Sequence, residues 1–355
     1  MARAKGYQGI VALKKATTWG TAVAGAALSG VYVSSLSTPG DTQLVDNPVI
    51  TGNVTMRIAA LGNRQVTVTL KSPLRYEGLE TAIALVMGTA GVPATVDTTG
   101  RQHDLKLANT IDGIFATLAY EIIKDTTIVE IPGVKWNKAT LTAKQGALVE
   151  IELGGIGDDY QPASAVNTTT TIDTVTLSAN EIYAVFKEVS LQMNAQTGGA
   201  LSGSDAVACE GITVTVERQM EPRVTTRRGD KTDEPIESGF AKVTGSLEFA
   251  FLETGADGNS GFMADQLAGT AKKAKLLVTS TVLAGSATVF FQHVLWMPNI
   301  QFEPGKPEVS GPEGLKWVQP FQCHHVAAIP TGFSAGFTQA LIWQIFSKLA
   351  TDPLA

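Results

Sequence analysis

Apolar and polar residues alternate with a period of two in several runs of the chain. In residues 65–70 the apolar positions are Val66, Val68 and Leu70, and the residues between them are polar. Residues 147–153 follow the same rule, with Glu150 and Glu152 on the polar side. Because side chains of a strand point alternately to its two faces, each run predicts a strand with one buried face.

A hairpin and several further strands follow from the same pattern. Residues 54–58 also alternate, and the sequence Leu61-Gly62-Asn63-Arg64 between them and 65–70 is typical of a turn, so the two runs are predicted to pair. Further strands are predicted at 115–123, 127–131, 134–141, 212–216, 243–252, 275–281, 287–294, 299–303 and 315–326. Apolar residues at three- and four-residue spacing predict helices at 73–88 and 260–268 that end at Gly88 and Gly269.

The order of these elements occurs twice. The run Gln65-Val-Thr-Val-Thr-Leu, a helix and Gly88-Thr89 correspond to Val243-Thr-Gly-Ser-Leu, a helix and Gly269-Thr270. Similarly, Ile131-Pro132-Gly133 corresponds to Met297-Pro298-Asn299. The sequence therefore predicts an internal duplication. The predicted divisions are an N-terminal arm at 1–50, a first domain with its linker at 51–180, a second domain at 181–330 and a C-terminal tail at 331–355.

Composition limits the classes of function. Hydrophobic residues make up 44% of the 355 residues, enough for a core, and the net charge of −6 disfavours a protein that holds nucleic acid through clustered cations. Cys209 and Cys323 lie far apart and are expected to be reduced core thiols. No signal peptide is expected, and the apolar stretch at 337–350 is too short to span a bilayer.

Local motifs do not indicate catalysis or a cofactor. Adjacent histidines in Cys323-His324-His325 would point to opposite faces of a strand, and His103 and His293 are isolated, so no metal site is predicted. Arg228-Gly229-Asp230 lies in a loop of mixed charge and is interpreted as a solvated or intersubunit loop. Glu150 and Glu152 share one strand face without a partner acid or nucleophile. Four aromatic residues near the end are expected to pack the tail: Phe333, Phe337, Trp343 and Phe346.

Three stretches resemble the major tail tube proteins of siphophages. Residues 14–23, Lys-Lys-Ala-Thr-Thr-Trp-Gly-Thr-Ala-Val, are similar to a common opening of that family, with Lys15 where an acid is more common. Residues 76–80, Tyr-Glu-Gly-Leu-Glu, follow a strand and precede a helix as in the family, and residues 237–245 resemble its strand entry.

The resemblance implies a mainly β fold with two similar tube-type β-sandwich or barrel domains. Each domain would carry one flanking helix, and strands of neighbouring subunits would join into a closed ring barrel. The implied function is that of a virion structural protein, not an enzyme, whose stacked rings form a conduit for genome ejection into the host bacterium. Its implied partners are further copies in trimeric, pseudo-hexameric rings or alternatively hexameric rings, a tape measure protein, double-stranded DNA in transit, and tail terminator and distal tail proteins. It would assemble in the host cytoplasm and reside in the virion tail, with no membrane and no cofactor.

On this reading, polar positions of the long hairpins are candidates to line the lumen, because an acidic and neutral wall would not retain DNA. These candidates are Thr55, Thr67, Thr69, Glu150, Glu152, Thr213, Thr215, Glu217, Ser246 and Glu248. The candidates for contacts between rings are Arg223, Arg227, Arg228 and Lys231. Residues 1–50 and 221–238 are poorly patterned for a core and are expected to become ordered only on a neighbouring ring.

Two other classes of function remain open from the sequence. One is a decoration or adhesin module, which would be a soluble monomer that binds a cell surface. The other is a β-sandwich hydrolase acting on sugars, which only scattered carboxylates support.

Overall fold

The computed structural model describes residues 10–25, 28–45, 60–123, 126–162, 166–250, 261–285, 288–305 and 317–355. The described chain is mainly β, as predicted, with three α-helices. Eighteen strands belong to one continuous antiparallel network, and two further strands form a separate small sheet. Within the described part of one chain, the network does not close into a barrel.

The first half contributes a set of strands with one helix: β1 (Val11–Ala16), β3 (Ser35–Ser37), β4 (Gly40–Val45), β5 (Ala60–Pro73), α1 (Glu80–Met87), β8 (Phe115–Ile123), β9 (Thr127–Lys144) and β10 (Glu150–Gly157). The second half contributes β12 (Val189–Ala195), β13 (Gly211–Glu217), β16 (Lys242–Phe249), α3 (Gly261–Ala268), β17 (Lys272–Leu283), β18 (Phe290–Phe302) and β19 (Trp317–Cys323). We call these the first set and the second set.

The remaining elements are short strands and helices and one separate hairpin. They are β2 (Ser29–Val31), β6 (Ala94–Thr95), β7 (Arg101–Lys106), β11 (Gln161–Pro162), α2 (Thr169–Asp173), β14 (Met220–Val224), β15 (Thr232–Glu237) and β20 (Ile342–Ser347). Two 3-10 helices cover Phe186–Glu188 and Gly203–Asp205.

The two sets have the same strand order and the same register. The first set runs β1, β8, β9, β10, β5, β4, and the second runs β12, β17, β18, β19, β16, β13. One row of directly paired residues in the first set is Lys15, Ala116, Val134, Gly157, Val66 and Gly40. The corresponding row of the second set is Ala195, Lys272, Ile300, Cys323, Val243 and Val216. This correspondence agrees with the duplication read from the sequence.

Each set has one helix between corresponding strands, and each helix stops at a glycine. The chain leaves α1 at Gly88 with φ of +77°, where its N–H bonds to the carbonyl of Ala84, and leaves α3 at Gly269 with φ of +62°. Glycine adopts this left-handed conformation without a Cβ penalty. The first helix begins at Glu80 rather than near residue 73. The sequence therefore predicted the end of this helix more accurately than its beginning.

Strand pairing connects the two halves of the described chain at β13 and also at β20. Strand β13 of the second set pairs with β9 of the first, with Thr215 opposite Thr140. At the other place, β20 lies between β18 and β7, so the C-terminal tail closes the gap between the halves. Phe337 and Trp343 of this tail are buried, in agreement with the predicted packed tail.

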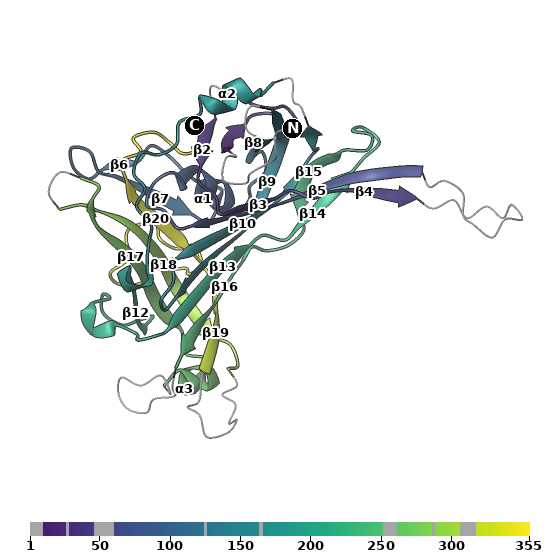
Figure 1. The fold of residues 1–355 in the computed structure, drawn as a ribbon. Coiled ribbons are helices and arrows are strands. Elements are labelled where there is room, and N and C mark those ends of the chain that lie inside the picture. The colour runs from purple at the N-terminus through teal and green to yellow at the C-terminus, as the bar shows by residue number, and fades with distance from the viewer. Residues whose placement is uncertain are drawn as a thin grey trace, which may run out of the picture.

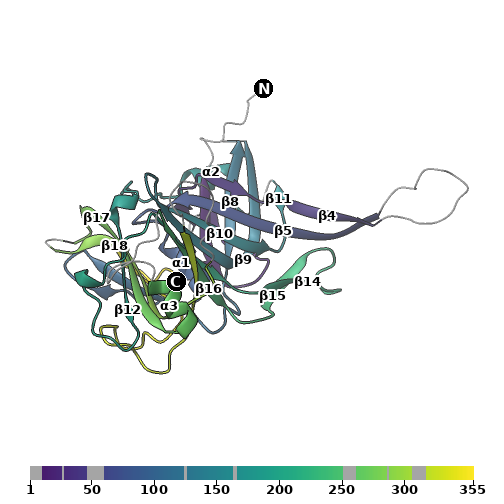
Figure 2. The same cartoon turned by 90° about the horizontal axis from the view of Figure 1, so that it is seen from below.

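The predicted hairpin at 54–70 is wrong in its turn and in its pairing. Residues 61–64 lie inside the continuous strand β5, whose partner is β4. The run 54–58 lies outside the described residues. Gly62 and Asn63 are compatible with a strand here because this part of β5 extends away from the body, as Figure 1 and Figure 2 show, where no tertiary packing demands bulky side chains.

The N-terminal region is more ordered than predicted. β1 pairs with β8 along its whole length, and Leu13 is fully buried in the core. β3 and β4 both pair with β5, and the register shifts between Thr42 and Leu44. The expectation that residues 1–50 become ordered only on a neighbouring ring is therefore wrong for residues 10–25 and 28–45. Short apolar runs in this region concealed its strands because few of its residues alternate.

Candidate functional site

A polar face extends across adjacent strands of the two sets. Five neighbouring strands, β5, β10, β9, β13 and β16, are paired in this order, and β19 follows. One row of directly opposed residues is Lys71, Glu152, Thr140, Thr215, Thr244 and Gln322. A neighbouring row is Pro73, Glu150, Thr142, Thr213, Ser246 and Pro320. Because directly paired residues point to the same side, these rows belong to one face, which we call the polar face.

The opposite side of the same strands forms the core. The residues that alternate with the polar positions are buried, including Val68, Ile151, Val214 and Leu247. These four were predicted to face the core, and the structure confirms this. Val54 lies outside the described residues. Such strict alternation fixes the register, since a slip of one residue would exchange the apolar and polar faces.

The structure brings together all the described lumen candidates. They lie on the polar face, on strands β5, β10, β13 and β16. The full set described is Thr67, Thr69, Glu150, Glu152, Thr213, Thr215, Glu217, Ser246 and Glu248, whereas Thr55 lies outside the described residues. Strands from both halves contribute, and only the β9–β13 pairing makes their polar residues continuous.

Lysines accompany the carboxylates of the polar face, which the sequence did not indicate. The ammonium of Lys71 lies 2.7 Å from the Glu152 carboxylate, and that of Lys144 lies 3.1 Å from Glu248. The hydrogen bond from Lys71 to Glu152 raises the pKa of this lysine. Glu217 is directly opposite Lys138 on one neighbouring strand and Lys242 on the other. Besides acidic and neutral residues, the polar face thus carries Lys71, Lys138, Lys144 and Lys242, each next to a glutamate.

The charged loop at 221–238 folds back on its own chain. It forms the β14–β15 hairpin, in which Arg223 is opposite Asp233. Arg228 lies 3.1 Å from Asp158, and Lys231 lies 2.6 Å from Asp159. The expectation that this loop orders only on a neighbouring ring is wrong, because ion pairs within one chain hold it. Of the four candidates for contacts between rings, Arg223 and Arg227 remain exposed.

Two buried cations explain why the base of this hairpin is fixed. Lys135 is fully buried and lies 2.8 Å from Glu234. Arg218 lies 2.8 Å from Glu237 and donates hydrogen bonds to the carbonyl oxygens of Val86 and Met87 at the end of α1. Burial costs such cations their hydration, so they require these partners. The sequence showed the charges of the loop but not their buried partners.

The motifs considered for chemistry have structural surroundings. His293 is buried, where its Nε2 contacts the carbonyl of Arg75 at 2.8 Å and its Nδ1 accepts a hydrogen bond from Trp343. Cys209 and Cys323 are both free thiols. In the described ranges, no group of three or more His, Cys, Asp or Glu side chains is arranged to hold a metal ion. None of the helices in the described part of the chain has both the length and the hydropathy of a membrane span.

Comparison with known proteins yields a match to a family model. The sequence model of the phage tail tube protein family matches residues 6–333, which include both sets of strands and the whole polar face. No curated protein shows significant similarity to the chain.

Proposed function

Because the chain belongs to the phage tail tube protein family, a family of virion tail structural proteins, we propose that it is the major tail tube subunit of a siphophage. Its rings would stack into a hollow conduit through which the genome is ejected into the host bacterium. The observation that carries this proposal is the polar face, which crosses strands of both sets and is backed by a continuous apolar core. Such a face suits the inner wall of a wet channel.

The equal registers of the two sets support the interpretation that each set is one tube domain. Within the chain, the two sets join through β13 and β9. If the same type of pairing joined one chain to the next, three chains would supply six sets and close a pseudo-sixfold barrel. The alternative is a ring of six chains. Barrel closure would also protect the outer edge of β3 and β4, for which the described residues of one chain provide no strand partner.

The polar face is proposed to line the lumen, and the pairing of its charges offers a reason for low affinity towards DNA. A free lysine in the wall would attract phosphate and release counterions. Lys71 and Lys144 already have carboxylate partners on the same face. Passing DNA would therefore meet a wall of balanced charge, and local ion pairs take the place of the uniform repulsion expected from the sequence.

The proposal also names partners and place. The tube would enclose a tape measure protein before ejection and double-stranded DNA in transit, and would end at tail terminator and distal tail proteins. Assembly would occur in the host cytoplasm, and the mature protein would reside in the virion tail without catalytic activity.

Imaging tests the assembly directly. Negative-stain electron microscopy of the purified protein should show rings or tubes with a central channel. A monodisperse monomer at high concentration, together with binding to bacterial surfaces, would instead support a decoration or adhesin module.

A charge-reversal variant tests the lumen. Glu150→Lys with Glu152→Lys removes two negative charges and adds two positive charges per chain on the polar face, and it removes the partner of Lys71. We expect tails of normal length with slowed or stalled genome ejection, because each ring would then retain phosphate. Ejection is followed by release of DNA from purified phage.

The matched control makes the same change in charge elsewhere, as Glu181→Lys with Glu221→Lys, at two exposed positions outside the polar face. This control should eject normally. Normal ejection by the Glu150 and Glu152 variant would refute the assignment of this face to the lumen.

A further inference from the structure

The turn of the β14–β15 hairpin lies in a defined seat on the first set. The Asp158 carboxylate accepts a hydrogen bond from the backbone N–H of Gly133 and forms the ion pair with Arg228. The backbone N–H of Thr232 bonds to the carbonyl of Asp158, and the indole of Trp19 donates to the carbonyl of Thr232. We call these surroundings, Trp19, Gly133 and Asp158, the first seat. A hairpin of the second set thus rests on the body of the first.

The second set has the same backbone arrangement at the corresponding place. The N–H of Asp158 bonds to the carbonyl of Gly133 at 2.9 Å, and the N–H of His324 bonds to the carbonyl of Asn299 at 2.8 Å. Each of these hydrogen bonds lies next to a register pair, Val134 with Gly157 in the first set and Ile300 with Cys323 in the second. These two register pairs correspond to each other. The position equivalent to the first seat is therefore at Asn299 and His324.

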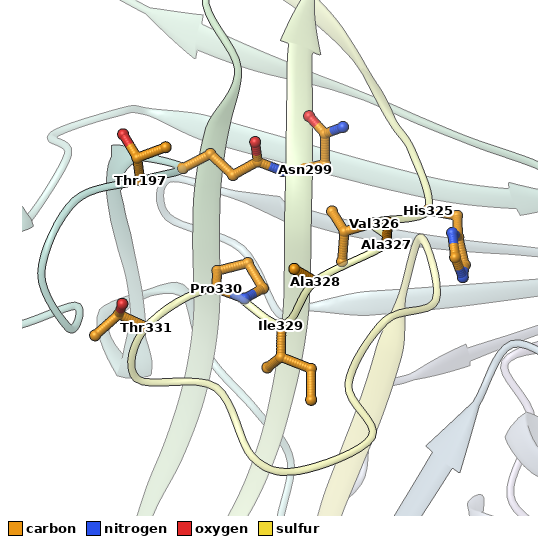
Figure 3. A pocket seen from close by; sticks show the side chains of 10 residues that line it. Thr197, Asn299, His325, Val326, Ala327, Ala328, Ile329, Pro330 and Thr331 are labelled. Carbon is orange, nitrogen blue, oxygen red and sulfur yellow. The ribbon is translucent and has the colours of Figure 1, made fainter.

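A pocket of about 400 Å³ opens at this equivalent position. Figure 3 shows Asn299 on its strand facing the loop that carries His325, Ala328 and Ile329, with Thr197 at one side. The side-chain oxygen of Asn299 is buried without a hydrogen-bond partner among the described residues. We call this pocket the second seat. Among the described residues, no hairpin of the same chain fills it, although a hairpin fills its counterpart.

The hairpin that corresponds to β14–β15 in the first set is β4–β5. In register, β4 and β5 correspond to β13 and β16, and β14–β15 lies in the connection between β13 and β16, so its counterpart is the outer part of the β4–β5 hairpin. The β4–β5 hairpin extends away from the body (Figure 1, Figure 2). Leu44 and Leu61 are directly opposite each other on it and are 66% and 78% exposed. An exposed apolar pair on a projecting hairpin is typical of a surface that another chain covers.

Each hairpin matches the polarity of its seat. Residues 222–236 contain seven charged side chains, whereas residues 46–59, between β4 and β5, contain two. The charged hairpin rests against Arg64, Asp158 and Asp159. The counterparts of these three residues in the second set are Ala241, His324 and His325, and Phe240 beside them is 91% exposed. A less charged hairpin thus corresponds to a less charged, partly apolar seat, and apolar contact would drive its burial.

We propose that the β4–β5 hairpin of a second copy of this chain occupies the second seat, as β14–β15 occupies the first seat within one chain. The proposal rests on self-assembly of the tube and specifies its lateral joint. The hairpin at the first seat would come from the same chain, whereas the hairpin at the second seat would come from a neighbouring chain.

Site-specific photo-crosslinking tests this contact. A benzophenone amino acid is placed at Asn53, midway between β4 and β5, in ¹⁴N chains that are assembled with ¹⁵N chains of wild type. We expect mixed-isotope crosslinks to the peptide that contains residues 324–331. The same probe at Val92, which is 85% exposed on another part of the surface, is the control and should not label that peptide.

A pocket-filling variant gives a second measurement. Ala328→Trp should lower both the Asn53 crosslink and the yield of tubes by about tenfold, the effect of losing one well-packed contact. Ala94→Trp, at an exposed position of β6, should leave both unchanged. Circular dichroism and thermal melting establish that both variants are folded.

The outcomes separate this joint from tube formation itself. Tubes whose Asn53 crosslinks reach other peptides, or arise only within one chain, would overturn the proposed joint and leave the tube function standing. A folded wild-type protein that forms neither tubes nor mixed-isotope crosslinks would overturn both.

Discussion

At the scale of single residues, burial gives several polar groups of this protein altered ionisation. Burial lowers the pKa of His293 from 6.5 to about 4 and raises that of Asp158 from 3.8 to about 6. The neutral imidazole of His293 accepts from Trp343 at Nδ1, so the other ring nitrogen donates to the carbonyl of Arg75. Protonation would add a charge in the core and replace this accepting atom by a donor.

The stability of the chain should therefore depend on His293 between pH 6.5 and 4. In this window the unfolded chain binds a proton that the folded chain does not, so the free energy of unfolding falls as the pH is lowered, by up to about 1.4 kcal/mol per unit. His293→Gln should be less stable at pH 7, and its deficit in melting temperature should shrink towards pH 4.5. His325→Gln, at an exposed site, should melt in parallel with wild type. A constant deficit for His293→Gln would show that the imidazole does not titrate in this way.

At the scale of elements, β1 is a core strand and not a dispensable arm. Ala12, Leu13 and Ala16 are completely buried, and β1 joins β2 to β8. Deleting residues 1–35 would thus remove a strand on which β8 packs.

Leu13→Ala should lower the free energy of unfolding by about 2–5 kcal/mol, because it leaves a cavity in the core. Urea denaturation of the assembly-free chain measures this loss. Lys14→Ala in the same strand changes a half-buried residue and should cost less than about 1 kcal/mol. Equal stability of Leu13→Ala and wild type would restore the interpretation of this segment as an arm.

At the scale of the whole molecule, the two sets of strands would provide the basis for the symmetry of the proposed ring. Equivalent registers in both sets and one joint between them already make the chain a pseudo-dimer of tube domains in the proposed interpretation. The sheet remains open within the described part of one chain. In the proposed ring, further copies of the chain would close the barrel.

Each ring of the tube should contain three chains, seen as threefold averages with pseudo-sixfold features in end views by cryo-electron microscopy. Native mass spectrometry of rings released from tubes should give three times the chain mass of 37.3 kDa. A ring of six chains would contradict the interpretation of each set as one complete tube domain.

The sequence by itself determined the strands whose two faces differ and the helix ends. The residues Val66, Val68, Ile151 and Val214 were assigned to the core correctly, because an alternating strand can bury only one of its faces. Gly88 and Gly269 marked the ends of α1 and α3 for an equally local reason, their tolerance of positive φ. The matching order of elements in the two halves was also readable, since the same local signals occur twice along the sequence.

Only the tertiary structure decided which strands are neighbours and which charges meet. The turn expected at 61–64 is part of a strand, because β5 pairs there with β4. Lysines such as Lys144 share the polar face with Glu248 because β9, β13 and β16 are paired in one register, which period-two patterns on separate strands cannot specify. The loop at 221–238 is ordered by Asp158, Lys135 and Arg218, and these long-range ion pairs depend on burial that no local pattern encodes.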